Sequence, residues 1–277
     1  MTRHQVRLAC CPACRQFGPP LPLARLPHLH VHGCQVCGHR YLDLEEAELN
    51  VQELYDEAYS GFVIDPLLLA AFRRELQSNL APKLTAGARM LDIGCGNGMF
   101  LRCAKEAGFD AEGIDISEAA VERCEQQGLK ARCGLIVNLV PEAPTFDCMT
   151  MWDVLEHLPD PSEVLARLAK GLRPGGLLVL KVPWVHDWIY RFGGVAPAFL
   201  RSLTKAPSHV QFFTESSLKR LLRRSGFAVA EWRWTGPLRT KPPLFTRRIQ
   251  RIPGRVLSRA ASATGLADNI LVTARRD

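Results

Sequence analysis

The sequence predicts an α/β protein built on a mostly parallel sheet, with a small cysteine-rich segment in front of it. Short apolar runs alternate with helical patterns from about residue 80 to residue 235, as in chains that form parallel sheets. Residues 94–98 are rich in glycine, at the point where an apolar run gives way to a helical pattern. Two C-x-x-C pairs stand before residue 40. We therefore expect one large domain and one small metal-binding unit.

Length and composition agree with this organisation. At 277 residues and 47% hydrophobic content, the chain can bury the core of one large domain and an appendage. No stretch approaches the roughly 18 apolar residues of a membrane span, and the first residues lack an apolar signal core, so we expect a cytoplasmic protein. The net charge of +7 suits an anionic partner, either RNA or a membrane surface, but does not decide between them.

The two C-x-x-C pairs predict a zinc ribbon. Cys11 and Cys14 form one pair and Cys34 and Cys37 the other, with a spacer close to that of known ribbons. Four thiolates fill a tetrahedral coordination sphere, so the zinc is expected to be structural. Cys10 in place of Cys11 would break the spacing. A site of three cysteines and one histidine stays an alternative, because four histidines lie nearby: His28, His30, His32 and His39.

The glycine-rich stretch predicts a tight turn that binds a ligand. Residues 90–93 suit a central parallel strand, and residues 99–108 have helical spacing. Glycines at alternate positions allow backbone angles that side chains forbid, and a missing Cβ lets a ligand approach the main chain. The helix that follows offers unpaired N–H groups. The spacing G-x-G-x-G, preceded by Asp92, differs from the dinucleotide fingerprint G-x-G-x-x-G.

A second short strand, residues 111–115, ends in an acid. Asp115 follows the glycines by about 20 residues, the spacing at which a carboxylate accepts hydrogen bonds from ribose hydroxyls. A capping role for Asp115 is the alternative, although Ser117 is the expected N-cap of a helix over 118–127. The remaining strands are expected at residues 130–133, 146–154, 177–183, 228–235 and 269–274.

These motifs, together with residues 153–161 and 171–176, resemble in order and spacing those of class I S-adenosylmethionine (SAM)-dependent methyltransferases usually labelled type 11 or type 12. The resemblance runs from about residue 80 to residue 235. It implies a Rossmann-like sheet of seven strands, with an antiparallel final strand, and SAM as the cofactor. It also implies these cofactor-binding residues: Asp92, Gly94, Cys95, Gly96, Gly98, Asp115, Ile116, Trp152 and Asp153.

One position departs from the family pattern. After the third strand the family often has an acid that meets the adenine amine, whereas this chain has Cys133, Gly134, Leu135 and Ile136. Contact with adenine would then depend on backbone and apolar groups.

The sequence divides into three parts. Residues 1–43 are the zinc-ribbon-like segment, residues 44–79 a helical linker that either covers the cofactor cleft or packs on the core, and residues 80–277 the methyltransferase domain. Two inserts lie in that domain. The aromatic insert 184–208 is expected to be a substrate lid, with simple packing on the core as the alternative. The basic amphipathic insert 237–262, in particular residues 237–259, could rest on anionic lipid, hold RNA or face solvent.

We expect methyl transfer from SAM to a small-molecule or lipid-linked acceptor, at oxygen or carbon. A hydroxyl acceptor needs a base, and His157 and His209 are the candidates because imidazole has a near-neutral pKa. An RNA base methyltransferase with a zinc ribbon is the first alternative, although no Asn-Pro-Pro-Tyr-like motif follows the fourth strand. A zinc-ribbon adaptor with a vestigial SAM site is the second, although the acids and glycines are intact. No obligate protein partner is expected.

Overall fold

The computed structural model describes residues 9–19, 21–26, 29–42, 65–183, 209–235 and 269–277. Several predicted features lie outside these residues: His28, most of the linker 44–79, the lid 184–208 and the insert 237–262. Among the described residues no helix is long and apolar enough to span a bilayer.

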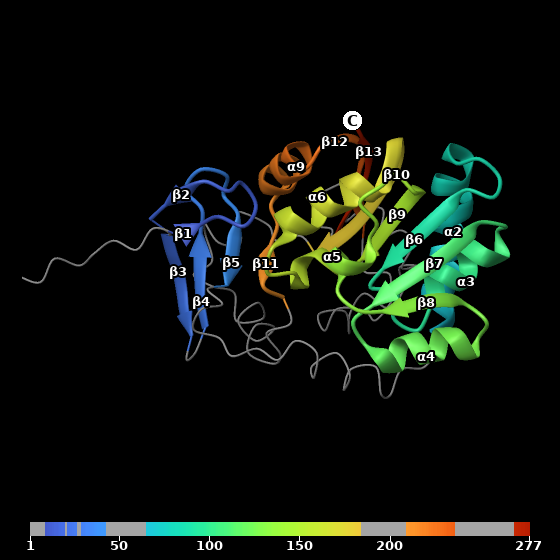
Figure 1. Cartoon of the computed structure of the whole chain (residues 1–277). Coiled ribbons are helices and arrows are strands. Elements are labelled where there is room, and N and C mark those ends of the chain that lie inside the picture. The colour runs from blue at the N-terminus through green and yellow to red at the C-terminus, as the bar shows by residue number, and fades with distance from the viewer. Residues whose placement is uncertain (1–8, 20, 27–28, 43–64, 184–208, 236–268) are drawn as a thin grey trace, which may run out of the picture.

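A sheet of seven strands forms the centre of the fold (Figure 1). Its strands are β6 (Arg89–Ile93), β7 (Asp110–Asp115), β8 (Lys130–Cys133), β9 (Phe146–Trp152), β10 (Leu172–Pro183), β12 (Phe227–Thr235) and β13 (Asn269–Arg276). The order across the sheet is β12-β13-β10-β9-β6-β7-β8. The strands from β8 to β10 pair in parallel, and β13 pairs antiparallel with both β10 and β12. The predicted sheet with its antiparallel final strand is confirmed.

Strand β10 begins earlier than the predicted fifth strand. Leu172 already pairs with Phe146, and the register shifts before Leu177. The two glycines in this interval explain the irregularity, because a Cβ at Gly176 would lie 2.8 Å from the carbonyl oxygen of Arg173. The strand and its bulge therefore include residues 172–176, which precede the strand predicted at 177–183.

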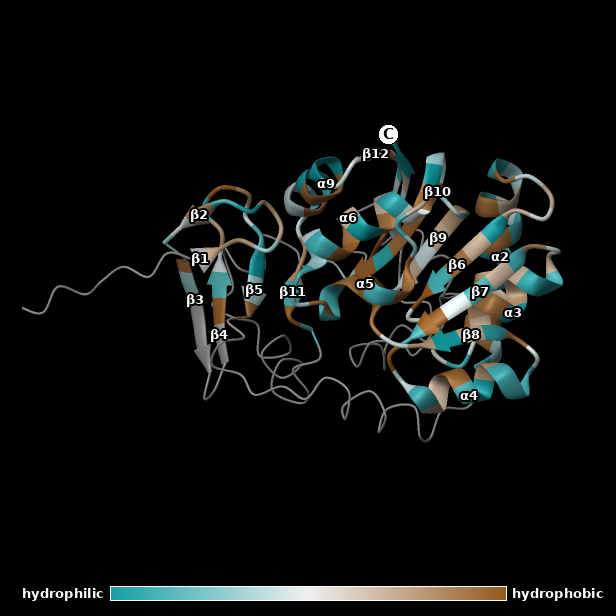
Figure 2. Ribbon diagram, in the orientation of Figure 1, coloured by the Kyte–Doolittle hydropathy of each residue, from teal (hydrophilic) through white to brown (hydrophobic). Residues whose placement is uncertain are grey.

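Helices cover both faces of the sheet. They are α2 (Pro66–Glu75), α3 (Met99–Glu106), α4 (Glu118–Gln126), α5 (Ile136–Leu139), α6 (Pro161–Gly171) and α9 (Glu215–Arg224). After α2 the chain continues through a π-helical turn (Leu76–Leu80) and a 3-10 turn (Ala81–Lys83) before the first strand of the sheet. Figure 2 shows teal and brown residues together on α4, α6 and α9, as expected of helices with one buried face.

Alternate residues of the strands enter different cores. Cys148 of β9 packs in the cluster that includes Phe72 of α2 and Phe100 of α3. Its neighbour Met149 packs in the other cluster, with Leu165 of α6. This alternation follows from the two-residue period of a strand, and it explains why the strands are apolar on both faces.

The cysteine-rich segment forms a small β unit beside the large sheet (Figure 1). Its strands are β1 (Ala9–Cys10), β2 (Phe17–Gly18), β3 (Leu21–Leu26), β4 (Leu29–Gly33) and β5 (Arg40–Leu42). A further short strand, β11 (Gln211–Phe212), comes from the second half of the chain and pairs antiparallel with β5. The resulting sheet has the order β11-β5-β4-β3. The cysteine-rich segment is therefore joined to the domain of the large sheet by backbone hydrogen bonds as well as by the continuous chain.

Candidate functional site

A cleft of about 420 Å³ opens at the carboxyl ends of β6, β7 and β9. In a parallel sheet with helices on both faces, ligands bind at this edge, where loops follow the strands. The segment after β8 and the start of α6 complete its walls. Six of the predicted site residues line it: Gly94, Asp115, Ile116, Trp152, Asp153 and His157.

The glycine turn between β6 and α3 needs residues without side chains. Gly94, Gly96 and Gly98 have φ angles of 68°, 52° and 79°, in the left-handed region. A Cβ at Gly94 would lie 2.5 Å from Cγ2 of Val154, so no side chain fits there. Of the predicted turn residues only Gly94 is among the described residues that line the cleft, and Cys95 is buried beneath the turn.

Asp115 is fixed at the end of β7. One carboxylate oxygen accepts a hydrogen bond of 2.8 Å from the backbone N–H of Gly96, and the other accepts one of 3.0 Å from the N–H of Ser117. Ser117 in turn caps α4, as predicted, by accepting from the N–H of Ala120 at 3.3 Å. The carboxylate therefore joins the glycine turn to the start of α4 in the wall of the cleft.

Asp92 lies behind the turn and is 2% exposed. Its carboxyl group accepts a hydrogen bond of 2.6 Å from the Thr150 hydroxyl. Burial raises the pKa of Asp92 to about 7. It is not among the residues that line the cleft, so its predicted contact with a cofactor stays a prediction, and the observed contact supports β6 against β9.

Trp152 is the last residue of strand β9, Asp153 follows it, and both line the cleft. The Trp152 ring packs against Phe72 and Phe100, each with its centroid 5.1 Å away. Asp153 has a φ of 57°, unusual for a residue with a side chain, and its carboxylate is paired with the Nζ of Lys181. Lys181 is 5% exposed and was not singled out from the sequence. The signal was present, because a lysine within the apolar run 177–183 needs a buried partner.

The segment after β8 gives the cleft an apolar wall. Leu135, Ile136 and Val137 line it, next to Gly134. This wall offers backbone and apolar groups, the kinds of group on which contact with adenine is expected to depend in this chain.

Two histidines and a glutamate gather at the end of β9. The rings of His157 and His209 have centroids 4.7 Å apart. Oε1 of Glu156 lies 3.9 Å from Nε2 of His157 and 4.0 Å from Nε2 of His209. The structure thus brings together the two predicted base candidates, although they are far apart in the sequence, and adds Glu156, which the sequence did not single out.

Glu156 is 1% exposed, and within the described part of the chain neither of its carboxyl oxygens has a hydrogen-bond partner. Burial, and then the charge of Asp153, raises the pKa of Glu156 well above its ordinary value. Burial lowers the pKa of His209, which favours the neutral imidazole. The three side chains also have the ligand types and the proximity to hold a metal ion.

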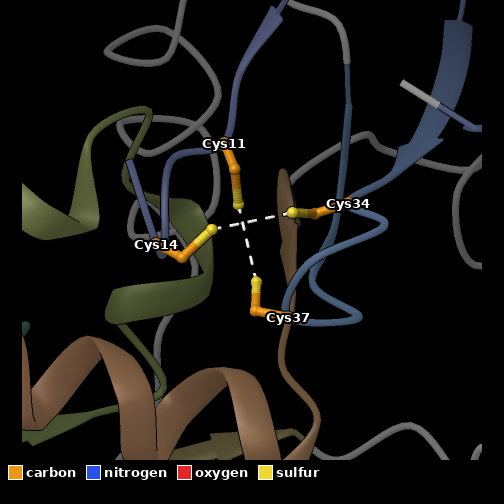
Figure 3. A group of neighbouring side chains, drawn as sticks. All are labelled: Cys11, Cys14, Cys34 and Cys37. Carbon is orange, nitrogen blue, oxygen red and sulfur yellow. Dashed lines mark hydrogen bonds between the residues drawn. The ribbon is translucent and has the colours of Figure 1, made fainter. Parts of the chain in front are cut away.

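The four predicted zinc ligands converge, as Figure 3 shows. The Sγ atoms of Cys11 and Cys37 are 3.7 Å apart, and those of Cys14 and Cys34 are 3.6 Å apart. Tetrahedral zinc with bonds of about 2.3 Å would place its sulfurs about 3.8 Å from one another, so the cluster fits this ion. All ten cysteines are free thiols, and Cys10 lies outside the cluster.

The histidine alternative for this site has no support from His32 or His39, and the side chains of His28 and His30 lie outside the described residues. Nε2 of His39 is 2.8 Å from the side-chain oxygen of Gln211, and His32 packs its ring against Tyr41. Neither belongs to the cysteine cluster.

A family model described as a methyltransferase domain matches residues 67–231. The chain belongs to this family. Similar curated proteins include a ubiquinone biosynthesis O-methyltransferase of Aromatoleum aromaticum, 33% identical over 155 residues, which are 53% of this chain and 66% of that protein. A protein of the same description from Methylococcus capsulatus is 32% identical over 154 residues, which are 52% of this chain and 65% of that protein. The chain thus spans slightly less than two thirds of the length of these relatives.

Solved structures agree on the fold. A SAM-dependent methyltransferase from Archaeoglobus fulgidus has a TM-score of 0.55 and 20% identity, over 81% of this chain and 99% of that chain. A complex between the Haloferax volcanii Trm112 methyltransferase activator and a methyltransferase has a TM-score of 0.59 and 16% identity, over 82% of this chain and 97% of that chain. The predicted class I methyltransferase fold is confirmed.

Proposed function

We propose that the protein is a SAM-dependent methyltransferase that methylates a hydroxyl group of a small-molecule or lipid-linked acceptor. The observation that carries this proposal is one cleft lined both by a cofactor-type turn and by a histidine that lies next to a second histidine and a glutamate. The relatives described as ubiquinone biosynthesis O-methyltransferases support an oxygen acceptor.

The residues of the cleft suit SAM. Gly94 lines the cleft and has no side chain that could keep a ligand from its backbone. The fixed carboxylate of Asp115 suits ribose hydroxyls, and Leu135 and Ile136 suit a flat apolar base. When bound, SAM supplies a methyl group on a sulfonium, an electrophile that an oxygen nucleophile can attack.

In the same cleft, His157 is the group that takes the proton from the acceptor hydroxyl. It lines the cleft, whereas His209 packs against its ring and Glu156 is buried behind both. A neutral imidazole within hydrogen-bond reach of a hydroxyl is an effective base at neutral pH.

The cysteine cluster holds a structural zinc ion in this proposal, because four thiolates leave no open position for catalysis. Peripheral contact with an anionic membrane through residues 237–259, and a lid formed by residues 184–208, belong to the proposal as well. Both segments lie outside the described residues.

A label-transfer experiment tests the function. Purified protein is incubated with SAM carrying a deuterated methyl group and with lipid, metabolite and RNA fractions of cells that lack the protein, and products are identified by mass spectrometry. We expect a labelled methoxy group in the lipid or metabolite fraction. A labelled nucleoside in the RNA fraction would contradict the proposal.

The role of His157 is tested by measuring methyl transfer to the acceptor that the label-transfer experiment identifies. His157→Asn should lower kcat about a hundredfold or more, the usual contribution of a general base. A strong chelator, applied for too short a time to remove zinc from the cysteine site, should leave the methyl transfer of the wild-type protein unchanged. Loss of activity that is restored by added Mg²⁺ or Zn²⁺ without reloading the cysteine site would instead assign Glu156, His157 and His209 to a catalytic metal.

A further inference from the structure

The cysteine ribbon is connected to the same short stretch of the methyltransferase part from each of its two C-x-x-C turns. That stretch, residues 158–160, links the end of β9 to α6 and lines the cleft on the side of His157. Arg15 of the first turn contacts the stretch directly, and His39 of the second turn is connected to it through Gln211.

Arg15 belongs to the first turn. Its backbone N–H donates to the carbonyl of Cys11 at 2.9 Å, which closes the turn around the first cysteine pair. Its guanidinium donates a hydrogen bond of 2.5 Å to Asp160. Asp160 lines the cleft and caps α6 by accepting from the N–H of Glu163 at 3.0 Å.

His39 belongs to the second turn. Its carbonyl accepts a hydrogen bond of 2.7 Å from the N–H of Cys34, so its position depends on the second cysteine pair. Its side chain is fully buried and meets the side-chain oxygen of Gln211 at 2.8 Å. Because that oxygen can only accept, Nε2 of His39 is the donor in this bond.

Gln211 connects His39 to the wall of the cleft. It is 3% exposed, and its amide nitrogen donates to the carbonyls of Leu158 at 3.0 Å and Pro159 at 3.1 Å. Both residues line the cleft. All donors and the acceptor of this side chain are thus engaged between the ribbon and the cleft wall.

The backbone of Val210, the residue before Gln211, also connects the ribbon to the end of β9. The N–H of Val210 donates to the carbonyl of Glu156 at 2.8 Å, and the carbonyl of Val210 accepts from the N–H of Leu42 in the ribbon at 3.0 Å. His209, which packs against His157, is the residue before it. Gln211 begins strand β11, which Figure 1 shows in orange between the blue ribbon and the yellow helices.

We propose that the cysteine ribbon stabilises the wall of the cleft near His157, where the acceptor would bind, and that Gln211 and His39 are positioning residues for the acceptor. We call this part of the cleft the acceptor side. The ribbon holds residues 156–160 and 209–211 in place through the two side-chain contacts and β11. The cofactor side has its own support, because the N–H of Gly94 donates to the carbonyl of Ile114 and Asp115 accepts from the N–H groups of Gly96 and Ser117. This inference rests on the proposed function for the meaning of the acceptor side, but its structural part can be tested alone.

Hydrogen exchange tests the structural part without any acceptor. The full protein, saturated with demethylated SAM, is compared before and after zinc is removed with a chelator. We expect at least tenfold faster exchange in peptides covering 156–160 and 209–212, and less than twofold change over 93–98 and 115–117. Unchanged exchange at 156–160, or an equal increase in both regions, would overturn the proposal.

A pair of glutamine variants tests the positioning role. Gln211→Leu removes the bonds to Leu158, Pro159 and His39, whereas Gln35→Leu removes a bond from an exposed glutamine of the same ribbon to the carbonyl of Pro19. With the acceptor that label transfer identifies, Gln211→Leu should raise its KM about tenfold and change kcat and the SAM Kd less than threefold. Gln35→Leu should leave all three unchanged.

Gln211→Glu separates positioning from general destabilisation. The carboxylate can still accept from His39, but it cannot donate to the two carbonyls, so it should raise the acceptor KM at least as much as Gln211→Leu. A Gln211→Glu variant with normal acceptor KM would overturn the role of Gln211. If the wild-type protein labels no acceptor at all, the proposed function fails, and the exchange experiment still decides whether the ribbon supports the cleft wall.

Discussion

Two buried carboxylates flank the glycine turn, and their surroundings give them different roles. Asp115 accepts hydrogen bonds from two backbone N–H groups and faces the cleft. Asp92 has one hydroxyl donor, Thr150, and lies behind the turn. Backbone donors stabilise a carboxylate, whereas burial with a single hydroxyl favours the protonated acid. The residue next to the ligand and the residue that supports it can therefore be distinguished by experiment.

Asp115→Ala should weaken the binding of SAM or its demethylated product. The loss of hydrogen bonds to a charged group costs about 1.5–3 kcal/mol, which is roughly ten- to hundredfold in Kd. Calorimetry measures this, with Asp110→Ala at the exposed start of the same strand as the control. An unchanged affinity in Asp115→Ala would contradict the ribose role.

Asp92→Asn should change how stability depends on pH. Because the pKa of Asp92 is raised to about 7 in the folded protein, the folded chain keeps a proton between about pH 4 and pH 7 that the unfolded chain has lost. The free energy of unfolding therefore falls as pH rises through this window, by up to about 1.4 kcal/mol per pH unit. The amide has no charge to bury, so the variant should lose this slope.

Urea unfolding at several pH values measures the effect. Asp110→Asn is the control, because pairing with Lys130 lowers the pKa of Asp110 and its contribution changes only in more acidic solution. Equal slopes for Asp92→Asn and the wild-type protein between pH 5 and pH 7 would show that Asp92 is not protonated there.

At the scale of elements, the turn between β6 and α3 and the two cysteine turns are rigid for different reasons. The glycine turn is fixed by steric fit, since Val154 occupies the space where a side chain of Gly94 would lie. The cysteine turns carry few large buried side chains of their own, and their four thiols converge on one point. Small β units of this kind usually depend on a metal for stability.

Gly94→Ala should destabilise the protein more than the same change in an ordinary left-handed turn. Gly175→Ala is the matched control, because Gly175 has a similar φ of 74° but no atom within 4 Å of the place that a Cβ would take. In the control the free energy of unfolding should fall only by about 1–2 kcal/mol, the cost of a left-handed backbone for a residue with a side chain. Gly94→Ala adds the collision with Val154, and Val154→Ala should restore part of the loss. Equal losses of unfolding free energy in the two glycine variants would contradict the steric argument.

The ribbon should contain one zinc ion per chain. Atomic emission on protein purified in metal-free, reducing buffer measures it. Cys37→Ser should lose the ion because it removes one of four ligands, whereas Cys10→Ser should retain it because Cys10 lies outside the cluster. A zinc content near zero in freshly purified wild-type protein would rule out the assignment.

For the whole molecule, the sequence predicted what local patterns determine. The strands of the sheet, the glycine turn and the cap at Ser117 depend on residues close together in the chain, and all three are confirmed. Contacts between distant residues were not predicted. The pairing of β11 with β5 joins residues 211 and 41, and Lys181 finds Asp153 only once β9 and β10 pair. The burial of Glu156 likewise depends on the return of residues 209–210 to the end of β9.

The acceptor class is a property of the whole molecule, and the basic segment 237–259 provides its test. If this segment rests on a membrane that holds a lipid-linked acceptor, the protein should co-sediment with vesicles that contain anionic lipid, and less so at high salt. Changing Arg247, Arg248 and Arg251 to Glu should abolish co-sedimentation and leave the SAM Kd unchanged.

The control for this experiment changes net charge equally at another surface. Arg102, Lys105 and Lys130 lie on α3 and β8, and their change to Glu shifts the net charge by the same amount. If that variant also fails to co-sediment with vesicles, the net charge of the protein rather than the segment 237–259 is responsible for membrane binding. If the segment instead holds RNA, its variant should bind RNA more weakly, with a salt dependence flatter by roughly one unit per lost phosphate contact. We expect retention of vesicle binding by the α3 and β8 variant and its loss by the 247–251 variant, because the proposal assigns membrane contact to residues 237–259.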